Sequence, residues 1–238
     1  MPTRLTDRCW LVELRGVNAY LVADLPDGVD DPHEADPEEY VLTLVDAGTP
    51  LDAGRLKRAV AETGHSLSEI ERVLVTHYDV DHVGALSRLA LDATVYMGGP
   101  DADYLTGRKR PPTRAHKGAL QRAFAPLLDA PGLTIETVRD DDRVGSFTVY
   151  HTPGHTQGHM AYVSDTLSLA FVGDLVMEKD GDLHPSPWVL SYDTEAVRES
   201  IHDLADREPA VEVLGMGHGV PFLRDGSVRL ARLGQTIE

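Results

Sequence analysis

Cysteine is almost absent from this sequence. The single thiol, Cys9, cannot form a disulfide within the chain, so cysteine provides no covalent framework. We expect Cys9 to be a small buried strand residue. Stability must then come from a hydrophobic core, which a chain of 238 residues is long enough to build.

Positive charge is also scarce. Only 4 of the 22 basic residues are lysines, whereas 25 of the 39 acidic residues are aspartates, and the net charge is −17. A surface of this sign repels nucleic acid and anionic membranes, which argues against both as partners. The few lysines and many aspartates resemble the cytoplasmic proteins of salt-accumulating halophiles, and an acidic mesophilic protein is the alternative.

Long apolar runs are lacking as well. No segment approaches the roughly 18 apolar residues needed to cross a bilayer. Residues 1–4 (Met-Pro-Thr-Arg) open no apolar signal segment, so a cytoplasmic protein is expected. No linker, internal repeat or low-complexity tract divides the sequence, and we therefore expect a single domain over residues 1–238.

Hydrophobic patterning predicts strands and helices in an order that occurs twice. Strands are predicted at residues 9–14, 17–23, 40–45, 72–76 and 93–97, and again at 133–138, 146–150, 160–164, 167–172 and 211–215. Helices are predicted at 51–63, 85–91, 119–128 and 194–206, the last capped by Asp193, and a surface loop at 24–39. Two such halves can pack sheet against sheet with helices outside, as a four-layer αββα sandwich of the α+β class.

Four polar clusters directly follow predicted strands. Residues 77–82 (His-Tyr-Asp-Val-Asp-His) supply four metal-ligand candidates within six positions. The other clusters are residues 151–159 (His-Thr-Pro-Gly-His-Thr-Gln-Gly-His), 173–174 (Gly-Asp) and 217–218 (Gly-His). Each cluster alone has an ordinary explanation as a turn or a helix cap. Because all four follow strand ends, we expect them to meet at one rim of the sandwich.

The order and spacing of these clusters resemble the metallo-β-lactamase superfamily. That family also shows an early Asn-x-Tyr/Trp-Leu, here residues 18–21, and a Val-Asp-x-Gly, here residues 45–48. The match spans the chain from Asn18 to His218. The resemblance implies the αββα fold of that family and a centre that holds two divalent metal ions.

The resemblance also implies how the ligands are divided. Seven residues would bind the two ions: His77, Asp79 and His155 the first, Asp81, His82 and His218 the second, and Asp174 both. Asp46 would support the ligand-bearing loops without binding metal. Zinc is the expected metal, and the hard oxygen of Asp79 makes manganese or iron the alternatives.

Asp79 departs from the family's usual His-x-His-x-Asp-His motif, in which a second histidine stands at this position. An aspartate oxygen leaves from the same γ carbon as the histidine ring nitrogen that would bind metal, so its reach is similar. Three outcomes remain open. Asp79 completes a binuclear site, or it binds weakly and leaves the first ion at partial occupancy, or the first site is lost.

The activity that the resemblance implies is metal-dependent hydrolysis. Two divalent ions about 3.5–4 Å apart can share a bridging hydroxide that attacks a carbonyl or phosphorus centre. Asp81 is the candidate catalytic residue for moving the proton to the leaving group. The substrate would be a small ester, lactone, thioester or phosphodiester, and the sequence does not rank these. Tyr104 and Tyr192 are weaker candidates for contacts with it, and the helix within residues 101–129 is expected to cover or flank the site.

Two other functions stay open. One is an iron-dependent oxidoreductase of the same fold, because the superfamily's diiron members carry a glutamate where Asp79 stands. The other is a non-catalytic binding or regulatory module, although six of the seven ligand positions hold the family's usual residue type. A homodimer is the default expectation for the assembly.

Overall fold

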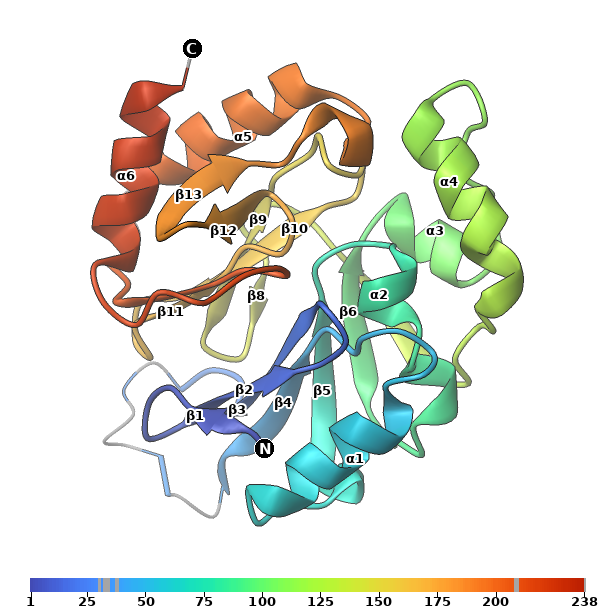
Figure 1. Cartoon of the computed structure of the whole chain (residues 1–238). Helices are drawn as coiled ribbons and strands as arrows, with labels where there is room; N and C mark the ends of the chain where they lie inside the picture. The colour runs from blue at the N-terminus through green and yellow to red at the C-terminus, as the bar shows by residue number, and fades with distance from the viewer. Residues whose placement is uncertain (30, 32–34, 37–38, 208–209, 238) are drawn as a thin grey trace.

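Two β-sheets lie face to face, with helices on the outer side of each, in the computed structural model of the chain (Figure 1). The structure describes residues 1–29, 31, 35–36, 39–207 and 210–237. Much of the loop predicted at 24–39 therefore lies outside the described residues. No helix in the described part of the chain has the length and apolar character needed to span a membrane.

The first sheet is built by the N-terminal half, with its strands in chain order. They are β1 (Thr3–Arg4), β2 (Cys9–Glu13), β3 (Asn18–Asp24), β4 (Val41–Val45), β5 (Ile70–Val75), β6 (Thr94–Gly98) and β7 (Thr134–Val138). The first four strands pair antiparallel, whereas β4 to β7 pair parallel. The carboxyl ends of β4 to β7 consequently share one edge of the sheet.

The second sheet comes from the C-terminal half. Its strands, in spatial order, are β14 (Val213–Gly215), β11 (Leu169–Phe171), β10 (Met160–Ser164), β9 (Phe147–His151) and β8 (Arg143–Val144). β11 and β14 pair parallel, so their carboxyl ends also lie together. A separate hairpin, β12 (Val176–Lys179) and β13 (Asp182–Pro185), follows β11, and the sequence patterning did not predict it.

The helices are α1 (Ala53–Glu62), α2 (Val80–Val83), α3 (Asp101–Leu105), α4 (His116–Phe124), α5 (Thr194–Asp206) and α6 (Gly226–Thr236). The prediction for α5 is confirmed, including its cap, because the Asp193 carboxylate accepts the N–H groups of Glu195 and Ala196 at 2.9 and 3.2 Å. The helix predicted at 85–91 is wrong. Only a 3-10 turn at Leu86–Arg88 forms there, because the backbone becomes extended at Leu89, with φ of −93° and ψ of 130°, ahead of β6.

Three buried apolar clusters separate the four layers. Along β3, Ala19 and Leu21 point to the helix side of the first sheet, whereas Tyr20 and Val22 point toward the second sheet. Tyr20 packs on Phe171 of that sheet, with ring centroids 4.7 Å apart. The third cluster lies between the second sheet and the helices α5 and α6. This layering confirms the four-layer αββα sandwich.

One ion pair is buried at the end of the sandwich away from the ligand-bearing strand ends. The Arg72 guanidinium donates to Asp24 at 2.5 Å, and the two residues are 4% and 0% exposed. Burial raises the pKa of Asp24, while the Ser146 hydroxyl and Arg72 favour its charged form. Loss of the arginine would leave a buried carboxylate without its cation.

Arg72→Met should therefore destabilise the protein by about 3–5 kcal/mol. Arg207→Met is the matched control, because Arg207 pairs with Asp140 and Asp141 at the surface. The control should lose about 1 kcal/mol or less. Urea unfolding at pH 7 measures both free energies. Equal losses in the two variants would contradict this account of Arg72.

Candidate metal centre

The candidate ligands lie on loops that leave four strands at one rim. His77 follows β5, His155 follows β9, Asp174 follows β11 and His218 follows β14. Asp79, Asp81 and His82 lie between β5 and the end of α2. The structure thus brings together all seven residues that the sequence analysis singled out.

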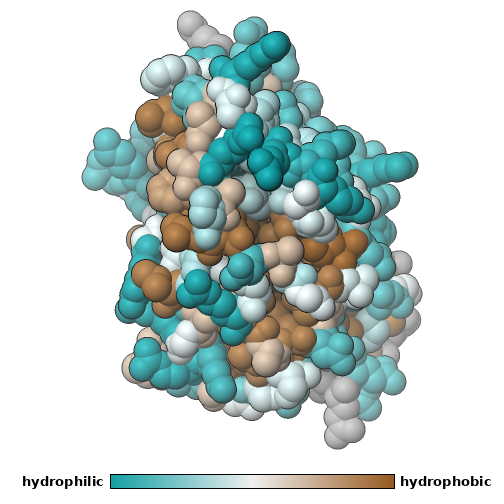
Figure 2. Space-filling view, turned by 90° about the vertical axis from the view of Figure 1, so that its right-hand side faces the viewer, coloured by the Kyte–Doolittle hydropathy of each residue, from teal (hydrophilic) through white to brown (hydrophobic). Residues whose placement is uncertain are grey.

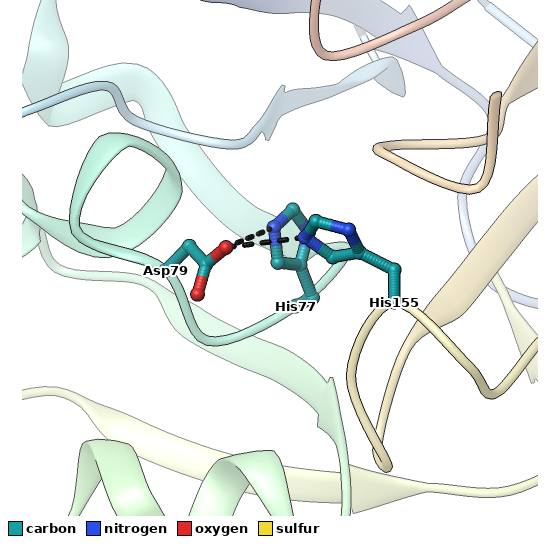
Figure 3. A group of neighbouring side chains, drawn as sticks. All are labelled: His77, Asp79 and His155. Atoms are coloured by element: carbon teal, nitrogen blue, oxygen red, sulfur yellow. Dashed lines mark hydrogen bonds and ion pairs between the residues drawn. The ribbon is translucent and has the colours of Figure 1, made fainter. Parts of the chain in front are cut away.

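His77, Asp79 and His155 form a first group (Figure 3). Oδ2 of Asp79 lies 3.4 Å from Nε2 of His77 and 3.1 Å from Nε2 of His155. Donor atoms about 2.0–2.2 Å from one tetrahedral ion are spaced about 3.3–3.5 Å apart. The spacing of the first group therefore suits a metal ion.

Asp81, His82 and His218 form a second group, and Asp174 lies between the two groups. Nε2 of His218 is 3.5 Å from Oδ2 of Asp81 and 3.2 Å from Oδ2 of Asp174. Oδ1 of Asp174 is 3.4 Å from Nε2 of His82, while its Oδ2 is 3.6 Å from Nε2 of His155. Asp174 consequently reaches both groups with its two oxygens.

The four imidazoles share one orientation. In each ring Nδ1 contacts an oxygen outside the centre, and Nε2 faces the centre. The outer oxygens of His77, His82, His155 and His218 are Thr76 Oγ1 at 3.0 Å, Asp46 Oδ2 at 2.8 Å, Ser186 Oγ at 2.8 Å and the Gly16 carbonyl at 2.6 Å. A hydrogen bond at Nδ1 fixes the tautomer that leaves Nε2 free to bind metal.

Asp46 organises two of these rings. Its Oδ2 accepts hydrogen bonds from the Thr76 hydroxyl and from Nδ1 of His82, each at 2.8 Å, and its Oδ1 accepts from the Thr76 N–H at 2.9 Å. The hydrogen of the Thr76 hydroxyl is directed to Asp46. In its contact with His77, the Thr76 oxygen can therefore only accept, so the proton of that ring lies on Nδ1. One carboxylate therefore sets the orientation of His82 directly and that of His77 through Thr76.

Three buried atoms of the centre make no hydrogen bond within the described residues: His77 Nε2, His82 Nε2 and Asp174 Oδ1. Buried polar atoms without partners are costly, and they indicate an ion or another group that the protein is built to hold. Two imidazole nitrogens and a carboxylate oxygen form a donor set that suits a divalent transition metal. The residues of the centre therefore fit a metal ion.

The pKa shifts of His77 and Asp174 suit metal binding. Burial, together with the neighbouring His82 and His155, lowers the pKa of His77 to about 4, so this ring is neutral at pH 7. Burial opposes ionisation of Asp174, but His82 and His218 outweigh it and hold the pKa of this carboxyl well below its usual range. A neutral imidazole and an ionised carboxylate are the forms that bind metal. Burial opposes protonation of His82 and His218, but Asp174 and Asp46 raise the pKa of His82 well above its usual range, and Asp174 raises the pKa of His218 to about 9. These two rings would therefore release a proton when metal binds.

Asp79 has two partners that the sequence analysis missed. Both come from α4: the Lys117 ammonium contacts Oδ2 of Asp79, and the Gln121 amide donates to its Oδ1 at 2.9 Å. Burial opposes ionisation of Asp79, but Lys117, His155 and His77 together hold its pKa well below the usual range. The aspartate at this unusual position was the only sequence signal for a cation nearby.

The sequence analysis also missed Asp101, whose carboxylate joins two of the loops. It is fully buried, and it accepts the N–H of Tyr78 at 2.8 Å and the N–H of Gly158 at 2.9 Å. Tyr104 and Tyr192 do not line the cavity at the centre. The Tyr192 hydroxyl instead donates to Oε1 of Gln121 at 2.7 Å, so it supports Asp79 from behind.

Glycine is required where β14 enters the centre. A Cβ atom on Gly217 would lie 2.1 Å from Oδ1 of Asp174 and 2.6 Å from Cε1 of His82. No side chain can be accommodated at those distances. In the Gly-His pair that the sequence analysis noted, Gly217 brings the backbone close to the centre and His218 supplies a candidate ligand.

The centre opens into a cavity of about 340 Å³. Asp81, Asp174 and His218 line its polar end, and Leu120, Phe124 and Leu128 from α4 and the segment after it line an apolar wall. Helix α4 lies at the right of Figure 1, and Figure 2 shows apolar side chains gathered between hydrophilic ones on that face of the molecule. The expectation that this segment flanks the site is therefore confirmed by the lining.

Comparison with known proteins agrees with this architecture. The sequence profile of the Metallo-beta-lactamase superfamily matches residues 14–218. The chain belongs to this superfamily. Proteins of the superfamily bind metal ions, and the described residues contain candidate His/Asp groups for them.

Relatives within the superfamily include hydrolases. The probable metallo-hydrolase YflN of Bacillus subtilis (strain 168) is 31% identical over 207 residues, which cover 78% of each protein. A hydroxyacylglutathione hydrolase of Cereibacter sphaeroides is 31% identical over 150 residues, which cover 59% of this chain but only 49% of that enzyme.

Solved structures share the fold. A metallo-beta-lactamase family protein from Thermus thermophilus superposes with a TM-score of 0.68 at 22% identity, covering 98% of this chain and 80% of that one. TTHA1623, solved in a di-iron-bound form, has a TM-score of 0.62 at 26% identity, covering 97% and 98% of the two chains.

Asp46→Asn should lower the affinity for Zn²⁺ by roughly 10–100-fold, because the amide NH2 cannot accept a hydrogen bond and would face either the Thr76 N–H or the Thr76 hydroxyl and Nδ1 of His82. Asp52→Asn is the matched control: Asp52 is equally buried, but it accepts from Thr49 and touches none of the four histidines. Competition with a chelator of known affinity measures both variants. Unchanged affinity in Asp46→Asn would refute the positioning role.

Proposed function

We propose that this protein is a metal-dependent hydrolase acting on a small ester, lactone, thioester or phosphodiester. The observation that carries the proposal is the arrangement of four imidazoles whose Nε2 atoms converge on Asp174, with three buried donor atoms left without hydrogen bonds among the described residues. The names of the related proteins YflN and hydroxyacylglutathione hydrolase support a hydrolytic activity.

The donors divide into two groups, and a binuclear centre, as the resemblance implies, would place one ion in each. His77, Asp79 and His155 would hold one, Asp81, His82 and His218 the other, and Asp174 would bind both. Divalent ions supply Lewis acidity there and lower the pKa of bound water toward neutrality. Zinc fits the imidazole-rich donor set, and the carboxylates also admit manganese or iron.

Asp81 is placed for proton transfer. Its side chain is 31% exposed, and it lines the cavity beside His218 and opposite the apolar wall. Of the carboxylates in the centre, Asp46 and Asp79 already accept hydrogen bonds from protein groups. Asp81 faces the cavity, and we therefore assign it the transfer of a proton to the leaving group.

The shape of the cavity bears on the substrate. Its polar end lies at Asp174 and His218, and its apolar wall lies on α4. A substrate with an apolar acyl part would place its carbonyl at the polar end and its acyl part against Leu120 and Phe124. This division favours esters, lactones and thioesters over phosphodiesters.

Hydrolysis of a panel with one member of each substrate class tests the proposal. Activity should be lost with a chelator and restored by Zn²⁺ or Mn²⁺. His82→Ala should lower kcat/KM by roughly a hundredfold or more, because it removes a donor of the second group. His151→Ala is the matched control, since the His151 ring is exposed and bonds the Gln157 carbonyl outside the centre. Chelator-resistant hydrolysis would contradict the proposal.

Asp81→Asn should lower kcat by about 10²–10⁴-fold for a substrate with an alkyl alcohol leaving group, which needs a proton to depart. The loss should be much smaller for a nitrophenyl ester, because nitrophenolate leaves without one. Steady-state kinetics on the two esters, with metal content checked in the variant, measure the difference. An equal loss on both would remove the proton-transfer role from Asp81.

Iron-based redox chemistry is the second candidate, supported by the 26% identical relative solved in a di-iron form. The acidic character of the centre, with Asp79, Asp81 and Asp174, suits iron as well as zinc. Iron bound on purification together with a visible absorption band would favour this candidate. Colourless protein that hydrolyses the panel with zinc would favour the hydrolase.

A further inference from the structure

Helix α4 sends two buried polar side chains to the first ligand group. Lys117 and Gln121 are 2% and 5% exposed, and their spacing of four residues places them on one face of the helix. The Lys117 ammonium contacts Oδ2 of Asp79 and lies 3.1 Å from Nε2 of His155. Two of the three donor atoms of the first group are thus engaged by a cation that belongs to the chain.

The stereochemistry of His155 makes this engagement exclusive. Nε2 of His155 lies 3.1 Å from the Lys117 ammonium and 3.1 Å from Oδ2 of Asp79, so it either accepts from the ammonium with its single lone pair or donates to the carboxylate. In the first case the lone pair is used, and in the second case the nitrogen carries a proton. The first metal ion would need this lone pair free. His155 therefore serves the pair of Lys117 and Asp79 or the ion, but not both.

Charge leads to the same conclusion. Two neutral imidazoles and the Asp79 carboxylate give the first group a charge of −1, which one ammonium neutralises. A divalent ion held by these three residues would leave the buried Lys117 beside a net positive charge and in competition with the ion for Oδ2 of Asp79, and a buried cation without its full counterion is strongly unfavourable. With the family's usual histidine at position 79, Lys117 would have no counterion, so the aspartate and the lysine explain each other.

Packing holds α4 in this position. The Gln121 amide donates to the Tyr78 carbonyl at 2.6 Å, and its oxygen accepts from Tyr192. A Cβ atom on Gly118 would lie 2.1 Å from the Pro112 carbonyl oxygen, so only glycine allows the helix to approach this closely. The packing of α4 therefore fixes the position of Lys117, which is not a freely moving surface residue.

We infer that Lys117 occupies the first ligand group as an internal cation, so that the protein binds one divalent ion, at Asp81, His82, His218 and Asp174. The inference rests on the metal centre of the proposed function, and it replaces the two ions of a binuclear centre with one ion and one ammonium. The cation that faces the cavity on the Asp79 side is then an ammonium. A substrate oxygen there would meet a hydrogen-bond donor in place of a second metal ion.

Metal counting tests the inference directly. The wild-type protein, Lys117→Ala and Lys109→Ala are each loaded with excess Zn²⁺, freed of unbound metal and measured by elemental mass spectrometry. We expect one ion per chain in the wild type and in Lys109→Ala, and two in Lys117→Ala. Lys109 is the matched control, because this exposed lysine pairs with Asp103 away from the centre.

Two further variants keep the test independent of how Lys117→Ala folds. Asp79→Asn should retain the single ion of the wild type, whereas His82→Ala should lose it. Two ions in the wild type, a single ion in folded Lys117→Ala, or loss of the ion in Asp79→Asn would overturn the inference. Absence of metal from every protein would overturn the proposed metal centre as well, which separates the two failures.

Discussion

The whole centre depends on the carboxylate of Asp46. It lies where β4 ends, in a left-handed backbone conformation with φ of 56°, and accepts hydrogen bonds from Thr76 and His82 on the neighbouring connection. These bonds fix the exit of β5 and the tautomers of two imidazoles at once. Without these bonds, nothing would hold the Nε2 atoms of His77 and His82 in the orientation that faces Asp174.

The sandwich makes such a centre possible by bringing strand ends of two sheets to one rim. The parallel strands β4 and β5 deliver Asp46 and His77, and the parallel pair β11 and β14 delivers Asp174 and His218. Tyr20 fastens the two sides together, because its ring packs on Phe171 and its hydroxyl donates to the Met216 carbonyl at 2.7 Å. The core and the site therefore share residues.

Much of this arrangement could be predicted from the sequence, for a physical reason. The ligand candidates sit in short segments directly after apolar strands, so strand position alone locates His77, Asp174 and His218 at a rim. The partners of these residues could not be predicted in the same way. Lys117 and Asp101 act on loops that are distant in the sequence, and neither lies in a motif. Only the packing of α3 and α4 brings them to Tyr78 and Asp79.

The role of Asp79 follows from its place in the motif and from its contacts in the structure. Its replacement of the usual histidine left three outcomes open, and its contacts with Lys117 and Gln121 favour a first group closed by a lysine. A crystal structure of the Zn²⁺-loaded protein with anomalous scattering tests this account most directly. The account predicts one anomalous peak, among Asp81, His82, His218 and Asp174, with the Lys117 ammonium between Asp79 and His155. A second peak bound by His77, Asp79 and His155, or no peak at all, would contradict it.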